Sequence, residues 1–510
     1  MNQYFLVIDA GTGSIRAIIF DIYGNQISIA QYEWNHVAED GIAGSMGFDF
    51  RAGWELARKC VQEAIAKSEI DPKNIIAVSA SSMREGIVVY DKNKNELWGV
   101  ANVDSRAGVE VAQLKHENKT MEHDFYKTSG QTFALSAAPR LLWLKNNRPS
   151  LYEKATYFTM ISDWILFKLS GELACEPSNA GTAGAFNLST RNWDKEQFKK
   201  CGLKDLFVPV LESGDILGKI SKSASDEIGL STHTLVVMGG GDVQIGTAGL
   251  GANTMGDAVV LGGSFWQQVV NVPVNAKLSD EMLLRVNPHV VQGMSQAEGI
   301  TFFTGLVMRW FRDTLGGGRS YSELEAMASK IPLGSHGILP IFSDSMKYGE
   351  WIHASPSFVG LGIDPLKYNI GSMFRALEEN ACIVSAINLE NIKAFSGVNP
   401  TSLIFASGAS QGPLWSQILA DVTGLEVKVP IVKEATALGV AMAAGIGAGV
   451  YTSFEEAGKN IVKMECSYQP KVEHYETYQE VKEKWIRVYA KQMELVREGI
   501  LEPMWKAPGI

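Results

Sequence analysis

A loop of small residues near the amino terminus combines residue types that bind phosphates in many proteins. It lies between two apolar runs, residues 5–8 and 18–20, and reads Asp9-Ala10-Gly11-Thr12-Gly13-Ser14-Ile15-Arg16. Gly11 and Gly13 lack Cβ atoms, so we expect the loop to adopt positive φ angles and to bring its amides close to an anion. The hydroxyls of Thr12 and Ser14 add two further donors. The loop therefore predicts a site for the phosphates of ATP.

Two charged residues flank this loop. Asp9 repels a phosphate, but its carboxylate can hold the Mg²⁺ that accompanies a nucleoside triphosphate, usually through water. Arg16 can reach a transferred phosphate, or it can be an exposed strand residue. The competing interpretation of the whole element is an ordinary β-hairpin with a glycine-rich turn, because short glycine motifs also occur without a ligand.

A second candidate for chemistry is an aspartate in a run of glycines. Asp242 follows Gly239-Gly240-Gly241 at the end of an apolar run. Few neighbours there can pair with an acid, so we predict that Asp242 is a general base that accepts the proton of a hydroxyl group. We also expect it to share the Mg²⁺ with Asp9, and Gln244 to contact substrate. The alternative is an aspartate that caps the following helix.

Arg84 and Glu85 are a third candidate, because they are adjacent and opposite in charge. They lie just beyond a predicted buried strand, residues 75–79, where open α/β sheets bind ligands. One side chain can donate to a polyhydroxy ligand and the other can accept from it. The alternative is a surface ion pair.

The elements that position these residues occur twice. Residues 5–8, 18–20 and 27–34 predict three antiparallel strands, a helix begins at Asp49, and residues 75–79 form the next strand. Residues 258–261, 262–264 and 265–271 again give a strand, a small-residue turn and a strand. A glycine-rich turn at 406–412 follows the strand 403–405 and suits the flat face of an adenosine.

The repeat predicts an α/β protein with two ribonuclease-H-like domains, as in actin-like ATPases, around a central cleft. We expect domains at residues 1–246 and 247–460, followed by a helical tail at 461–510 that packs on the core. A chain of 510 residues is long enough for two such cores.

Composition restricts the partners and the compartment. The net charge of -10 and the lack of a long basic cluster argue against nucleic acid or an anionic membrane, which leaves a small-molecule substrate. Five scattered cysteines fit a reducing, cytoplasmic compartment. Residues 435–454 carry no charged residue and are rich in alanine and glycine, which predicts a tightly packed buried helix with a glycine-rich end and not a membrane span.

The order of short motifs resembles that of the FGGY family of carbohydrate kinases over essentially the whole chain. The motifs are D-A-G-T-G-S-I-R, S-S-M-R-E-G, V-D-S-R, A-P-R-L-L-W-L, I-S-D-W, G-G-G-D-V-Q and E-A-T-A-L-G. The resemblance implies an ATP- and Mg²⁺-dependent kinase whose catalytic aspartate falls on Asp242 and whose substrate pair falls on Arg84 and Glu85. By the same matching, the predicted ATP contacts are Gly11, Thr12, Gly13, Ser14, Arg16, Gly263, Ser264, Gly305, Gly408 and Gly412.

Two departures from the family pattern bear on the ligands. Ser407 stands where many relatives have a glycine. Leu135 stands where glycerol kinases place a substrate-binding tyrosine, and it leaves an apolar wall that suits a compact dihydroxydione with a methyl ketone end. Two alternatives to a kinase of such a dihydroxydione stay open. One is a kinase of a pentulose or another small polyol, and the other is an actin- or Hsp70-like ATPase switch. The resemblance also names the phosphocarrier protein HPr as a candidate partner.

Overall fold

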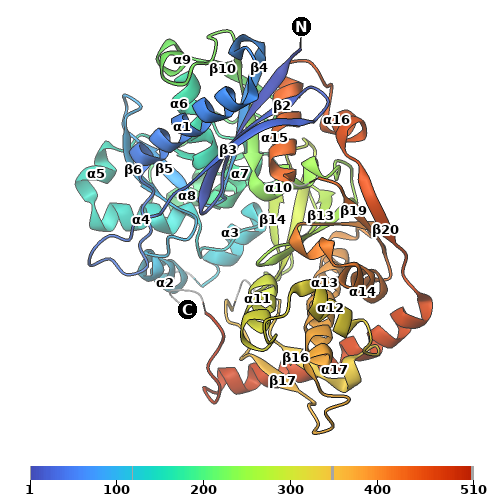
Figure 1. Cartoon of the computed structure of the whole chain (residues 1–510). Coiled ribbons are helices and arrows are strands. Elements are labelled where there is room, and N and C mark those ends of the chain that lie inside the picture. Colours follow the sequence, from blue (N-terminus) through green and yellow to red (C-terminus); the bar gives the residue numbers. More distant parts are fainter. Residues whose placement is uncertain (1, 118, 346–349, 433, 507–510) are drawn as a thin grey trace.

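The computed structural model describes residues 2–506 except 118, 346–349 and 433. Each half of the chain contributes one large mixed sheet (Figure 1). The first sheet has the spatial order β10 (Ile216–Lys219), β11 (Leu235–Gly241), β4 (Ile75–Ser82), β1 (Tyr4–Ala10), β2 (Ser14–Asp21) and β3 (Gln26–Glu33). The second has the order β14 (Arg285–Pro288), β15 (Met294–Thr301), β13 (Trp266–Pro273), β12 (Ala258–Gly262), β18 (Ser402–Ala406), β19 (Glu426–Pro430) and β20 (Met464–Tyr468).

The two sheets share one strand pattern, which confirms the predicted internal repeat. In the first sheet β1, β2 and β3 form an antiparallel meander, and β4 and β11 run parallel to β1. In the second sheet β12, β13 and β15 form the meander, and β18 and β19 run parallel to β12. An antiparallel edge strand, β10 or β20, ends each series. This is the ribonuclease-H-like pattern that the sequence predicts.

The central strands of the first sheet, β1 and β4, are buried almost throughout because helices cover both faces of the sheet. Leu6 and Ile8 point to the face that is covered by α1 (Phe50–Ser68) and α6 (Ile161–Ser170). Phe5 and Val7 alternate with them and point to the opposite face, which is covered by α15 (Ala435–Gly447). Figure 1 shows α15 beside the blue strands of this sheet, although it belongs to the second half of the chain.

The alanine and glycine residues of α15 allow this helix to pack closely against a second helix. A Cβ on Gly439 would lie 1.9 Å from the carbonyl oxygen of Ile245, in α10 (Asp242–Gly249), and one on Gly249 would lie 2.0 Å from that of Ala435. Only glycine lets the two helices approach this closely. The predicted buried helix is therefore confirmed, and no helix among the described residues is long and apolar enough to cross a membrane. Because α15 covers the first sheet, the expected boundary at 247 does not separate the elements that pack on each sheet.

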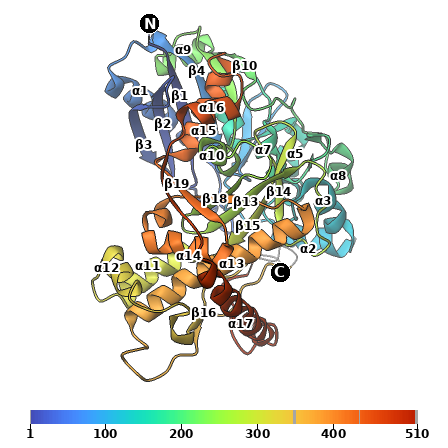
Figure 2. The same cartoon turned by 90° about the vertical axis from the view of Figure 1, so that its right-hand side faces the viewer.

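The second sheet packs against helices of the second half of the chain, which occupy the lower part of Figure 1 and are seen from the side in Figure 2. They are α11 (Thr304–Thr314), α12 (Tyr321–Ala328), α13 (Ile370–Ser396), α14 (Pro413–Thr423) and α17 (Val472–Arg497). Tyr478 and Trp485 of α17 are buried in this core, as expected for a tail that packs on it. The predicted helical tail, residues 461–510, contains the long helix α17, but a strand precedes this helix, because β20 pairs with β19 and extends the sheet.

Smaller elements complete the fold. A three-stranded sheet has the order β6 (Glu96–Val100), β5 (Ile87–Tyr90) and β7 (Tyr157–Met160), and two hairpins pair β8 (Phe186–Asn187) with β9 (Asn192–Trp193) and β16 (Leu339–Ile341) with β17 (Ser357–Val359). The remaining helices are α2 (Gly108–Glu117), α3 (Met121–Ser129), α4 (Ala137–Asn147), α5 (Pro149–Lys154), α7 (Pro177–Ala180), α8 (Lys195–Lys200), α9 (Lys222–Ile228) and α16 (Phe454–Ile461).

Candidate active site

A cavity of about 490 Å³ opens in the second domain, which is large enough for a nucleotide. Five residues that the sequence predicts as ATP contacts all line it, although they lie up to 149 positions apart in the chain: Gly263, Ser264, Gly305, Gly408 and Gly412. They come from the turn between β12 and β13, the start of α11 and the turn between β18 and α14. The repeat of the fold therefore brings the second glycine turn and the strand-to-helix turn to one place.

The glycines of this cavity have different physical roles. A Cβ on Gly305 would lie 2.4 Å from the carbonyl oxygen of Gly263, so Gly305 is required for the packing of α11 against the hairpin turn. A Cβ on Gly408 would meet nothing within 4 Å, so its backbone borders open space. Gly408 thus leaves its peptide groups accessible to a ligand, whereas Gly305 shapes the wall.

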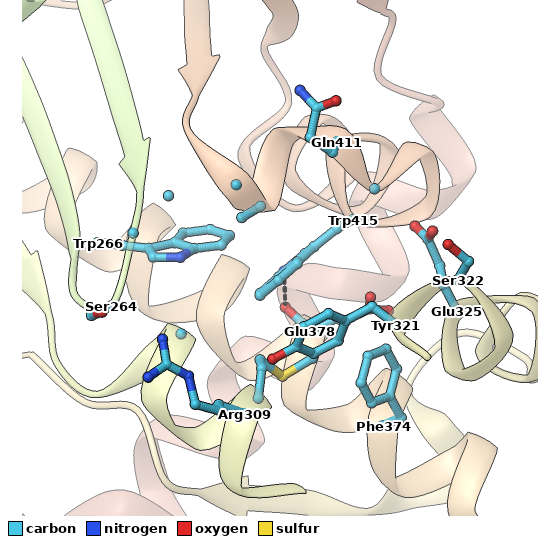
Figure 3. A pocket seen from close by; sticks show the side chains of 17 residues that line it. Ser264, Trp266, Arg309, Tyr321, Ser322, Glu325, Phe374, Glu378, Gln411 and Trp415 are labelled. Atoms are coloured by element: carbon cyan, nitrogen blue, oxygen red, sulfur yellow. Dashed lines mark hydrogen bonds between the residues drawn. The ribbon is translucent and has the colours of Figure 1, made fainter. Parts of the chain in front are cut away.

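Aromatic side chains form the opposite wall, and sequence reasoning did not assign them (Figure 3). Trp415 packs on Trp266 with ring centroids 4.8 Å apart, and its indole Nε1 donates to the backbone carbonyl of Glu378 at 3.2 Å. The rings of Phe374 and Tyr321 also face the cavity. Flat rings of this kind suit a planar base, whereas Arg309, which lines the cavity from α11, offers a positive charge to a phosphate.

A second cavity, of about 290 Å³, adjoins the first and lies between the two domains. Arg16 and Asp242 line it from the first domain, and Leu261 and Ser407 line it from the second. Leu261 and Ser407 are the chain neighbours of Gly262 and Gly408, which line the larger cavity. The same two turns therefore border both cavities, and Asp242 lines the smaller one.

Asp242 is the first residue of α10, at the carboxyl end of β11, and its side chain is 38% exposed. The position preceding the helix is occupied by Gly241, and the Asp242 carboxylate accepts a hydrogen bond from the N–H of its neighbour Val243, at 2.8 Å. Desolvation in the cleft raises the pKa of Asp242 to about 7, although the Arg84 guanidinium, 3.5 Å away, opposes this. A carboxylate with a pKa near neutrality is well suited to exchange a proton with substrate.

Arg84 and Glu85 are both buried, so the alternative of a surface ion pair is wrong. Neither pairs with the other. Arg84 donates to both carboxylate oxygens of Glu298, on β15, at 2.5 and 3.0 Å, and Glu85 accepts from Arg285, on β14, at 2.5 Å. Burial disfavours ionisation of Glu85, but Arg285 and Arg84 outweigh this effect and hold its pKa below its usual value. Two ion pairs thus join the first domain to the second beside Asp242.

Sequence reasoning missed the partners of this pair. The sequence does contain one indication that Glu298 is special, because it is the one charged residue in the strand β15. Nothing in the sequence connects Arg285 to Gln131, whose Oε1 accepts from Arg285 Nε at 3.0 Å, or Arg140 to the backbone carbonyl of Glu85 at 2.5 Å. These contacts span more than fifty residues of chain and depend on the assembled domains.

Gln244 lies away from both cavities. It is fully buried, and its Nε2 donates to Gln296 at 3.2 Å. The Oε1 atom of Gln244 has no hydrogen-bond partner among the described residues. Leu135 is half-buried and packs beside Trp351.

The amino-terminal loop differs from its expected conformation. Neither Gly11 nor Gly13 has a positive φ angle, so that expectation is wrong; the turn between β1 and β2 is made with ordinary torsions. Thr12 is exposed, and its hydroxyl accepts from Asn102 at 3.0 Å. Ser14 is half-buried, and residues 11–14 line neither of the two cavities.

Arg16 does not project freely into solvent. Its guanidinium bonds to the carboxylates of Asp9 and Glu434, which come from β1 and from the residue before α15. Burial raises the pKa of Asp9, which is 2% exposed, and Arg16 offsets part of that effect. The three side chains therefore form a charged cluster at the edge of the smaller cavity.

Ser407 has a backbone conformation that is normally reserved for glycine, with φ 79° and ψ −167°. Such a residue costs on the order of 1–3 kcal/mol. We expect Ser407→Gly to stabilise the protein by about 1 kcal/mol, since part of the relief is offset by the greater flexibility of glycine when unfolded. The melting temperature measures this. Ser407→Ala, which keeps the Cβ, is the control and should melt like the wild type. A glycine variant that melts at or below the wild type would contradict the assignment of strain.

The sequence matches known proteins over its whole length. Residues 4–249 match the N-terminal domain of the FGGY family of carbohydrate kinases, and residues 270–448 match its C-terminal domain. The chain is 53% identical to a protein of Salmonella paratyphi A and 52% identical to one of Klebsiella pneumoniae subsp. pneumoniae, both named autoinducer-2 kinase. Each alignment covers 100% of this chain and 98% of the relative.

Solved structures share the fold at lower identity. A xylulose kinase from Rhodospirillum rubrum has a TM-score of 0.87 at 21% identity, and the match covers 97% of this chain and 100% of that one. A Plasmodium falciparum glycerol kinase with ADP has a TM-score of 0.82 at 17% identity, with 96% and 98% covered. With both family domains present in order, the chain belongs to the FGGY family of carbohydrate kinases and is an ATP-dependent kinase of a small-molecule substrate.

Proposed function

We propose that this kinase phosphorylates the terminal hydroxyl of autoinducer-2, in its linear form 4,5-dihydroxy-2,3-pentanedione, and yields phospho-autoinducer-2 and ADP. The observation that carries the proposal is the 52–53% identity, over the full chain, to relatives named autoinducer-2 kinase. The site supports it, because Arg84 and Glu85 are held beside Asp242 at the domain junction, where they can orient neighbouring hydroxyl and carbonyl oxygens.

The geometry suggests how the residues divide the work. ATP binds in the larger cavity, with its phosphates at Gly263, Ser264 and Arg309, and its terminal phosphate extends past Ser407 toward Asp242. Asp242 accepts the proton of the substrate hydroxyl as that oxygen bonds to the γ-phosphorus. The bond from the γ-phosphorus to the bridging oxygen breaks, and its electron pair leaves with ADP. We further propose that Thr12, Gly13 and Ser14 contact the phosphates once the cleft closes.

We also propose Mg²⁺ as the cofactor, and the donor set fits it. Asp242 and Glu434 line the smaller cavity, and Asp9 lies behind Arg16. Carboxylates at this cavity suit Mg²⁺, which keeps several waters and binds one or two carboxylates together with substrate phosphates. When bound, the ion neutralises phosphate charge; Asp242 and Asp9 would hold it through water.

Substrate choice tests the proposal. Leu135 lacks the hydroxyl with which a tyrosine would bind glycerol, and a site with few polar partners leaves the extra hydroxyls of a sugar unsatisfied. We therefore expect kcat/KM for 4,5-dihydroxy-2,3-pentanedione to exceed that for glycerol, xylulose and ribulose by on the order of a hundredfold. The measurement is ADP release with each acceptor.

Two outcomes would change the assignment. An equal or higher kcat/KM for any of those three acceptors would replace the dione with a pentulose or small polyol as the substrate. ATP turnover that is the same without an acceptor would favour an ATPase switch instead. The control without an acceptor is therefore part of the same assay.

Two further parts of the proposal concern cellular context. We propose a cytoplasmic location, since five scattered cysteines suit a reducing compartment and ATP is the phosphoryl donor. We also propose HPr as a protein partner, on the resemblance alone. Calorimetric titration of purified HPr into the kinase tests this, and the absence of a binding signal at micromolar concentrations would remove it.

A further inference from the structure

Glu378 is a buried acid in the wall of the larger cavity that the mechanism above does not use. It lies on α13, and its side chain is 2% exposed. None of the described residues donates a hydrogen bond to its carboxyl group, and the Oε2 atom is fully enclosed. The nearest cation on the same helix, Arg375, bonds instead to Glu379 at 2.9 Å. The described residues therefore leave the carboxyl group of Glu378 without a hydrogen-bond donor.

The surroundings of Glu378 favour its neutral form. Burial raises the pKa of this carboxyl group well above its usual value, and the carboxylate of Glu325 raises it further. A neutral carboxyl group has one O–H to donate and one oxygen to accept. A buried polar group without a partner costs free energy, so a ligand that supplies a hydrogen-bond partner to this carboxyl group gains affinity.

The distribution of charge in the cavity indicates which part of a nucleotide meets Glu378. Glu325 also lines the cavity near Glu378, and its carboxylate repels phosphates. Arg309 and the accessible peptide groups of the glycine turns offer the phosphates a better site. The rings of Phe374 and Trp415 provide flat apolar faces that suit a base (Figure 3). An adenine presents ring nitrogens that accept and an amino group that donates, which complements a neutral carboxyl group.

We propose that the carboxyl group of Glu378 hydrogen-bonds the adenine base of ATP and so sets nucleotide affinity. The backbone of Glu378 is already fixed by the indole of Trp415, which donates to its carbonyl oxygen, so the side chain is presented from a rigid helix. The proposal rests on ATP as the phosphoryl donor, but it is independent of the identity of the acceptor.

Calorimetric titration of ATP into the full chain, without acceptor, tests this. Glu378→Met replaces the carboxyl group with an apolar group of similar length, and we expect it to raise the Kd of ATP by about tenfold or more. Glu378→Gln keeps one donor and one acceptor and should stay within about threefold of the wild type. Glu390→Met, on the exposed face of the same helix, is the matched control and should leave the Kd unchanged.

Each outcome decides the proposal. A wild-type Kd for Glu378→Met overturns it, and so does a Glu378→Gln variant that binds as weakly as Glu378→Met. Loss of fold is checked by the melting temperature without nucleotide, which Glu378→Met should leave equal or higher, because it removes an unsatisfied polar group. In turnover assays the variant should raise the KM for ATP and leave the KM for the acceptor unchanged. A failure of the dione as substrate would not alter the titration, so the two proposals fail separately.

Discussion

Asp242→Asn is expected to lower kcat by at least about a hundredfold, which is the usual effect of removing a general base. Asparagine keeps the shape of the side chain at the start of α10 but cannot accept the proton. Because the pKa of Asp242 lies at about 7, wild-type kcat should also fall as the pH is lowered through that value, where the carboxylate becomes protonated. The residual activity of the variant should lack this dependence. Initial rates of both proteins, measured between about pH 5.5 and 8.5, cover the range over which such a group titrates and show the loss of kcat and the loss of its pH dependence.

Controls separate catalysis from binding and stability. Ionisation of Asp242 is disfavoured in the folded protein, so asparagine should not lower the melting temperature at neutral pH. The Kd of ATP should stay near that of the wild type. Near-normal kcat would exclude Asp242 as the base, and a higher KM with kcat preserved would make it a binding residue.

Arg84→Met should destabilise the protein strongly, because it leaves the carboxylate of Glu298 buried without its partner. Breaking a buried ion pair in this way costs about 3–5 kcal/mol. The double variant Arg84→Met with Glu298→Met removes both charges and should recover most of the loss. Arg58→Met, which breaks an exposed pair with Glu55 on α1, is the control and should cost about 1 kcal/mol or less. Melting temperatures at one scan rate compare the four proteins.

The same double variant also tests whether Arg84 influences the pKa of Asp242. Arg84 holds the pKa of Asp242 lower than desolvation alone would set it. Without Arg84, that pKa should rise, and the fall in kcat at low pH should begin at a higher pH than in the wild type. If Arg84→Met alone is as stable as the wild type, the ion pair between Arg84 and Glu298 does not stabilise the fold. An unchanged pH profile in the stable double variant would show that Arg84 does not act on Asp242.

The sequence by itself determined the fold and several members of the site, because these depend on local patterns. The apolar runs and small-residue turns predict both copies of the meander. Glycine-rich turns mark Gly263, between β12 and β13, and Gly408, between β18 and α14, and both residues line the nucleotide cavity. Asp242 stands out because a charged residue directly follows three glycines. The alanine and glycine content of α15 predicts its burial, since only small residues permit the crossing with α10.

The tertiary structure alone decided which side chains meet. Glu298 and Arg285 lie some two hundred positions from Arg84 and Glu85, and no local pattern links them; pairing follows from the docking of β14 and β15 beside the carboxyl ends of the first sheet. Backbone torsions could not be predicted from the sequence either. Gly11 and Gly13 permit positive φ angles without requiring them, whereas Ser407 adopts a positive φ angle at an energetic cost. The unsatisfied carboxyl of Glu378 is likewise visible only in three dimensions, because a glutamate on a helix is exposed or buried according to what packs against that face.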